Sequence, residues 1–321
     1  MIAPTTTPTT DQPTPNESSV APDRTAMGRQ TLPDGQSVKT GSVVSKDGTT
    51  IGYYEYGSGP AVVVLHGSMV SARSFSTLAE GLAEGHTVFV PDRRGRGLSG
   101  PFRPDHSMQT ELADLEAVLA KSGARDVFAV SAGALVALRE ALRGPGLQRL
   151  ALYEPALSVA GSLAPSLERL DRELADGDIA GALVTGMLET GQGPSAFRVM
   201  PRPILEALTA ATMRSEEKKA GPGDVTMRQL APTQHQDFEL IAAMSDTLED
   251  YRAIGAEVLL MEGSKSPAWT RVALAALADT LPHATRIEFE GLDHGGATNP
   301  GPTARASDPA RIAQELRRFF G

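Results

Sequence analysis

The stretch V127-F-A-V-S131-A-G133 decides the fold, because an apolar run ends at a serine and continues into small residues. Residues 127–130 are short and wholly apolar, which is typical of a buried parallel strand. Residues 132–142 are rich in alanine and leucine and predict a helix. A serine on a sharp turn between a strand and a helix is exposed as a nucleophile must be, and small neighbours let such a turn pack closely. The usual pattern for such a turn, G-x-S-x-G, has glycine two residues before the serine, where this chain has Ala129.

The alternation of strand and helix continues on both sides of this stretch. Strands are predicted at 42–45, 50–56, 61–65, 86–90, 150–153, 258–261 and 285–289, and helices at 75–82, 108–119, 269–281 and 309–320. Residues 158–250 interrupt the series with a mostly helical pattern. The sequence therefore predicts an α/β fold with a mostly parallel central sheet flanked by helices, and a helical lid inserted at the carboxyl edge of the sheet.

Three regions follow from this pattern. We expect an α/β core built from residues 31–157 and 251–321, with the lid at 158–250. Residues 1–30 are rich in threonine and proline and have few large apolar side chains, so we expect a disordered tail. The tail lacks the basic start and apolar segment of a secretory signal, and we expect a cytoplasmic location.

The composition excludes several classes of function. The 321 residues carry a formal charge of −9, which argues against a nucleic-acid partner and against attraction to an anionic membrane. There are no cysteines, so disulfides, thiolate metal sites and a cysteine nucleophile are excluded. We expect a small-molecule substrate, a monomer or homodimer, and no metal or organic cofactor.

Two further motifs follow the first predicted buried strands. L65-H66-G67-S68 comes after the strand at 61–65, and P91-D92-R-R-G95-R-G97-L-S99 comes after the strand at 86–90. In this order, and followed by the serine turn, they resemble the α/β-hydrolase superfamily over nearly everything from about residue 40 to 321. The resemblance implies a serine hydrolase whose nucleophile is Ser131.

The resemblance also implies the partners of the nucleophile. The oxyanion hole would be formed by the backbone N–H groups of Ser68 and Ala132, with Met69 as an alternative to Ser68. His294, in G291-L-D-H294 after the last strand, would be the base. His66 would hold the oxyanion loop, and Asp92 and Arg94 would be structural.

The acid departs from the commonest pattern of this superfamily. The usual carboxylate position after the strand at 258–261 is Ser266, which cannot hold a histidine by charge. Some branches, including haloalkane dehalogenases, place the acid at the end of the strand after the nucleophile helix. Glu154 occupies that place here, and we assign it the role of acid. The alternatives are Glu262, Asp293 and Asp105.

The predicted activity is hydrolysis of an ester, lactone or thioester of a small, largely apolar molecule through an acyl-enzyme. Alternatives are a C–C bond hydrolase, a cyclase or acyl transferase acting on a natural-product intermediate, and a non-catalytic ligand-binding protein of the same fold. We interpret Trp269, the chain's only tryptophan, as core packing. His106, His235 and Asp237 could border the pocket, and we assign them no role.

Overall fold

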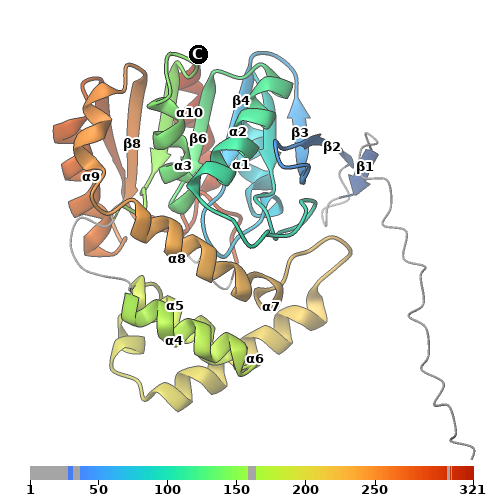
Figure 1. Cartoon of the computed structure of the whole chain (residues 1–321), viewed down its shortest axis with the longest axis vertical. Helices are drawn as coiled ribbons and strands as arrows, with labels where there is room; N and C mark the ends of the chain where they lie inside the picture. Colours follow the sequence, from blue (N-terminus) through green and yellow to red (C-terminus); the bar gives the residue numbers. More distant parts are fainter. Residues whose placement is uncertain (1–27, 32–36, 158–163, 302–303, 305) are drawn as a thin grey trace, which may run out of the picture.

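A nine-stranded sheet forms the centre of the molecule (Figure 1). The computed structural model describes residues 28–31, 37–157, 164–301, 304 and 306–321. The strands are β1 (Gly28–Thr31), β2 (Ser37–Val44), β3 (Thr50–Gly57), β4 (Ala61–Leu65), β5 (Thr87–Pro91), β6 (Asp126–Val130), β7 (Arg149–Tyr153), β8 (Glu257–Gly263) and β9 (Ala284–Phe289). Each strand predicted from the sequence overlaps one of them, and the α/β fold class is confirmed.

The strands run in the order β1-β2-β3-β5-β4-β6-β7-β8-β9. The pairs β1-β2, β2-β3 and β3-β5 are antiparallel. The remaining pairs, from β5-β4 to β8-β9, are parallel. The chain leaves β4 for β5 on one side and returns to β6 on the other, which creates a switch point where ligands bind in open sheets. Leu65 pairs with Ala129, and Val130 pairs with Tyr153. The residues that follow β4, β6 and β7 therefore meet at one edge of the sheet.

Helices cover both faces of this sheet. On one face α1 (Ser76–Leu82) lies against α10 (Pro309–Phe320), and on the other lie α2 (Met108–Ser122), α3 (Ala132–Ala141) and α9 (Ala268–Thr280). Alternate side chains of β4 enter the two cores. Val62 and Val64 pack on the side of α1 and α10, and Val63 and Leu65 pack on the side of α2, α3 and α9. This burial on both faces explains why β4 reads as one continuous apolar run.

The helices between β7 and β8 form a separate layer beside the core (Figure 1). They are α4 (Ala164–Ala175), α5 (Ile179–Glu189), α6 (Arg202–Lys219), α7 (Met227–Leu230) and α8 (Gln234–Ala243), with 3-10 turns at Ser195–Arg198, Ala231–Thr233 and Leu248–Ala253. We call residues 164–253 the helical insertion. Its α8 contacts both α3 and α4. Met69, which follows β4, packs against an apolar cluster of the insertion formed by Leu183, Met213 and Ala231, so the insertion lies at the carboxyl edge of the sheet.

The amino-terminal boundary of the folded part differs from the prediction. Residues 28–30, which we assigned to the tail, belong to β1 and pair in antiparallel register with β2. Strand pairing uses backbone groups, so it does not require the apolar side chains that this segment lacks. Gln30 also accepts a hydrogen bond from the Tyr54 hydroxyl at 3.0 Å. The rest of the predicted tail, residues 1–27, and residues 158–163 of the predicted lid lie outside the described residues.

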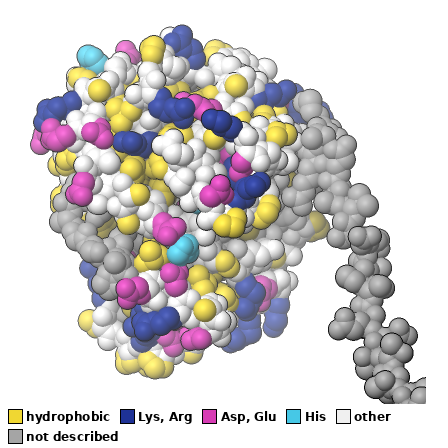
Figure 2. Space-filling view, viewed as in Figure 1, with side chains coloured by type: hydrophobic (Ala, Val, Ile, Leu, Met, Phe, Trp, Pro, Cys, Tyr) yellow, Lys and Arg dark blue, Asp and Glu magenta, His cyan; other side chains and the backbone are white. Residues whose placement is uncertain are grey.

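Among the described residues, no helix is long and apolar enough to cross a membrane. On the face seen in Figure 2, acidic and basic side chains are interspersed.

Candidate active site

Ser131 stands on the sharp turn predicted for it. It lies between the last residue of β6 and the first residue of α3, with φ 53° and ψ −120°. Positive φ is uncommon for a residue with a side chain and is held here by the surrounding structure. A Cβ at Gly133 would lie 2.4 Å from the His66 carbonyl oxygen, so only glycine fits there. Ala129 is fully buried without distorting the strand, which explains why alanine is tolerated in place of the usual glycine.

His294 lies in the loop after β9, with its ring between Ser131 and Glu154. Its Nε2 is 3.1 Å from Ser131 Oγ, and its Nδ1 is 2.6 Å from Glu154 Oε2. A carboxylate only accepts hydrogen bonds, so we assign the ring proton to Nδ1 and leave Nε2 free to accept from the serine hydroxyl. The Tyr153 hydroxyl donates to the Asp293 carbonyl at 2.7 Å and ties the histidine loop to β7.

Glu154 directly follows β7 and is fully buried. Its backbone φ is 47°, a second strained residue at this edge of the sheet. Its Oε1 accepts the Gly263 N–H at 2.7 Å and the hydroxyl of Ser266, which leaves Oε2 for His294. Ser266 has no carboxylate and cannot itself be the acid. In the structure, Ser266 donates to the carboxylate that takes the acid's place.

Glu154, and none of the alternative carboxylates, is the partner of His294 Nδ1. Glu262 bonds Arg286 Nε at 2.7 Å. Asp293 accepts the Gly295 N–H at 2.9 Å, and burial raises the pKa of its carboxyl. Asp105 is exposed in the loop before α2. Of the four candidates, Glu154 is the one that the structure brings to His294 Nδ1.

The residues predicted to form the oxyanion hole belong to two segments that adjoin the serine. Ala132 is the first residue of α3, where a backbone N–H has no carbonyl partner within the helix. A Cβ at Gly67 would lie 2.8 Å from Ser131 Cβ, so the loop that carries Ser68 and Met69 passes directly by the serine. Met69 has φ 56°, the third strained residue of this edge.

His66 holds this loop in place. Its Nε2 accepts the Arg93 N–H at 2.9 Å, and its Nδ1 donates to the Gly67 carbonyl at 2.9 Å. Burial, reinforced by Arg96 and Arg93, lowers the pKa of His66 well below its ordinary value, so the ring is neutral. These bonds fit the structural role that the resemblance implies.

The loop after β5 is fixed by buried charges. Asp92 accepts the N–H groups of Ala72 at 2.7 Å and Leu98 at 2.8 Å. Arg94 is fully buried and bonds Asp114 and Asp47. These bonds fit the structural role that the resemblance implies for Asp92 and Arg94.

A second buried ionic cluster, not predicted from the sequence, joins the loop after β5 to α2 and α8. Arg93 forms a two-pronged pair with Glu111 of α2, at 2.7 and 3.0 Å, and also bonds Asp237 of α8 at 2.8 Å. Arg96 bonds the other oxygen of Asp237. Burial acts to raise the pKa of Glu111, but Arg93 and His106 outweigh it and hold the pKa well below its ordinary range. The three arginines within five residues of this loop were the available signal.

The remaining candidates divide between the core and the insertion. His106 lies 3.3 Å from Glu111 Oε1, and His235 bonds Asp171 at 2.7 Å. Trp269 packs partly against the core as predicted, but its ring also lies beside that of His294, with 5.7 Å between the ring centroids.

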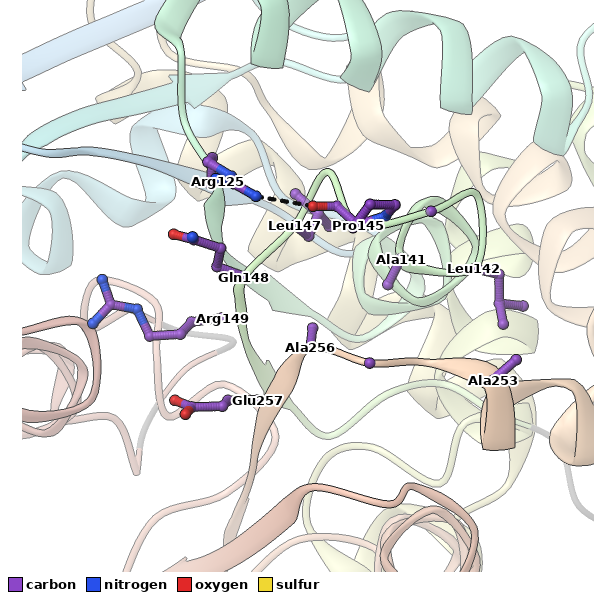
Figure 3. A pocket seen from close by; sticks show the side chains of 12 residues that line it. Arg125, Ala141, Leu142, Pro145, Leu147, Gln148, Arg149, Ala253, Ala256 and Glu257 are labelled. Atoms are coloured by element: carbon purple, nitrogen blue, oxygen red, sulfur yellow. Dashed lines mark hydrogen bonds between the residues drawn. The ribbon is translucent and has the colours of Figure 1, made fainter.

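A groove of about 700 Å³ lies at the opposite edge of the sheet (Figure 3). Its lining includes Gln148, Arg149 and Glu257, near the starts of β7 and β8, and Arg125 donates to the Pro145 carbonyl there at 3.0 Å. None of the residues of the serine site lines this groove. Among the described residues, no group of three or more histidine or acidic side chains is placed to hold a metal ion.

Comparison with known proteins identifies the family. Residues 62–314 match the profile of the Alpha/beta hydrolase family. The chain is 30% identical over 278 residues to a non-heme haloperoxidase of Rhodococcus erythropolis. This alignment covers 82% of this chain and 96% of the relative. It is 37% identical over 130 residues to N-formylmaleamate deformylase of Pseudomonas putida, 39% of this chain and 48% of the relative.

A solved structure agrees with this assignment. An alpha/beta hydrolase from Sphaerobacter thermophilus is similar with a TM-score of 0.68 and 31% sequence identity, over 87% of this chain and 100% of that one. The profile and the haloperoxidase alignment each cover most of the chain, and the profile includes the loops that carry Ser131 and His294. The chain therefore belongs to the alpha/beta hydrolase family.

Proposed function

We propose that the protein is a serine hydrolase that cleaves an ester, lactone or thioester of a small, largely apolar molecule through an acyl-enzyme on Ser131. Membership of the family supports hydrolase activity in general. The observation that carries the finer proposal is the hydrogen-bonded line from Ser131 Oγ through the ring of His294 to the buried carboxylate of Glu154.

This line supplies the proton transfers of acyl transfer. His294 Nε2 takes the hydroxyl proton as Ser131 Oγ attacks the carbonyl carbon, and Glu154 balances the charge of the imidazolium. The N–H of Ala132 and that of Ser68 or Met69 stabilise the oxyanion, each by roughly 3 kcal/mol. The imidazolium then returns its proton to the leaving group. Water, activated by the same ring, attacks the acyl carbon and releases the acid from Ser131.

The surroundings of the serine favour a small apolar substrate. Ser131 is 8% exposed, so an acyl group must enter a largely closed site. Met69 belongs to an apolar cluster with Leu183 and Met213 of the insertion, and methionines adapt to irregular apolar groups. We propose that the insertion acts as a lid that shapes this acyl site.

A fluorophosphonate probe tests the proposal. It should label the protein once, and mass mapping should place the label on Ser131. Ser131→Ala should abolish labelling and lower kcat on p-nitrophenyl butyrate by about 10⁴-fold or more. Ser122→Ala is the matched control, because Ser122 is the last residue of α2 and its hydroxyl bonds only nearby backbone groups, the Val118 and Leu119 carbonyls and the Ala124 N–H; it should behave as wild type. Labelling elsewhere, or full turnover by Ser131→Ala, contradicts the proposal.

A further inference from the structure

The segment Ser266–Trp269, which leads into α9, contacts the acid, the base and the helical insertion together. Ser266, two residues before α9, donates to Glu154 Oε1. Trp269, the second residue of α9, places its ring beside that of His294, with 5.7 Å between centroids and 59° between planes. The same side chain donates its Nε1–H to the Thr190 carbonyl of the insertion at 2.8 Å. Four consecutive residues therefore connect the insertion with both partners of Ser131.

The bond between Trp269 and Thr190 holds the end of a helix. Thr190 is the C-cap of α5, and carbonyls in the last turn of a helix have no partner within it. The indole N–H can only donate a hydrogen bond, so the half-buried side chain of Trp269 needs an acceptor. Trp269 thus satisfies the carboxyl end of α5 and fixes its position against the α/β core.

The ring contact restrains the histidine. The imidazole can serve Ser131 and Glu154 at once only in one orientation, because its two nitrogens face opposite partners. Tilted aromatic pairs at this separation are favourable, so rotation of the imidazole out of line would lose the contact with the indole as well as two hydrogen bonds.

We propose that Trp269 is a positioning residue that couples the helical insertion to the His294 ring. Its N–H keeps the end of α5 closed against the core, and its ring keeps the imidazole aligned between Ser131 and Glu154. Such coupling is reciprocal: displacement of α5 loosens the imidazole, and occupancy at Ser131 is felt at the indole. This inference rests on the proposed serine hydrolase.

Two substitutions separate the two contacts. Trp269→Phe keeps an aromatic ring but removes the N–H, and it should raise KM for p-nitrophenyl butyrate by roughly 2- to 10-fold with kcat nearly unchanged. Trp269→Leu removes both contacts, and it should in addition lower kcat and the rate of fluorophosphonate labelling by roughly 2- to 10-fold. Val272→Ala is the matched control, because Val272 lies one turn further along α9 and is 54% exposed. It should match wild type.

The wild-type chain provides a readout without any substitution. Trp269 is the only tryptophan, so fluorescence excited at a wavelength that indole absorbs and tyrosine does not reports this side chain alone. Labelling of Ser131 by the fluorophosphonate should change that emission at the same rate as it abolishes turnover. The same reagent should leave the emission of Ser131→Ala unchanged.

The outcomes are distinguishable. A labelled wild type with unchanged emission overturns the coupling while leaving the hydrolase intact. The coupling is also overturned if Trp269→Phe and Trp269→Leu both fold and share the same kcat and KM. Failure of the wild type to label or to hydrolyse any ester overturns the proposed function instead.

Discussion

Replacing Glu154 by glutamine tests the acid through the tautomer of His294. The Gly263 N–H and the Ser266 hydroxyl both donate to Oε1, so the carbonyl oxygen of the new amide must occupy that place. Its NH₂ group then faces His294 Nδ1, at the position where Oε2 lies 2.6 Å from that nitrogen. An NH₂ group donates, so Nδ1 must accept and the ring proton moves to Nε2. Nε2 can then no longer accept the proton of Ser131 Oγ, 3.1 Å away.

The magnitude follows from the loss of both base and counter-charge. A histidine held in the wrong tautomer, without an anion to balance its imidazolium, costs roughly 10²- to 10⁴-fold in kcat. At 1.36 kcal/mol per factor of ten, this is about 3 to 5 kcal/mol of transition-state stabilisation. The amide keeps the bonds from Gly263 and Ser266, so the fold and Tm should change little.

The assay compares two glutamine variants by kcat on p-nitrophenyl butyrate and by the rate of fluorophosphonate labelling. Glu262→Gln is the matched control, because Glu262 is buried at the end of the neighbouring strand but bonds Arg286. It should stay within about 5-fold of wild type, since it leaves the tautomer of His294 unchanged. The reasoning is refuted if Glu154→Gln retains wild-type kcat, or if Glu262→Gln loses as much.

Three further predictions concern stability. Asp237→Asn should lower the free energy of unfolding by about 3 to 5 kcal/mol in urea titration, because buried Arg93 and Arg96 lose a shared carboxylate; a loss below about 1 kcal/mol contradicts this. Burial raises the pKa of Glu140 to about 7 from 4.5, so the folded state keeps a proton that the unfolded state releases, and stability falls as pH rises through this window. Glu140→Gln should therefore reduce the drop in Tm between pH 5 and pH 8, and an equal drop in both proteins would count against it. Deleting residues 2–27 should leave Tm unchanged, whereas deleting 2–31 removes β1 and should lower it; equal Tm values for the two truncations would show that β1 contributes nothing.

Most of the fold could be predicted from local patterns, and the three residues of the serine site from the resemblance to the α/β-hydrolase superfamily. Buried parallel strands require apolar side chains on both faces, so runs such as 61–65 and 127–130 are visible in the sequence. Residues that directly follow such strands meet at one edge of the sheet, whatever the details of packing. That rule brings Ser131 and Glu154 to the same edge, whereas their roles, and the role of His294, follow from the resemblance to the superfamily.

Contacts between the core and the helical insertion were decided only by the tertiary structure. Trp269 lies 79 residues from Thr190, and Arg93 lies 144 residues from Asp237. Periodicity describes which side of its own element a residue faces, but not which other element is packed there. The sequence therefore indicated core packing for Trp269 and no role for Asp237. The packing of α5 and α8 against the core gave the indole N–H an acceptor and the arginines their carboxylate.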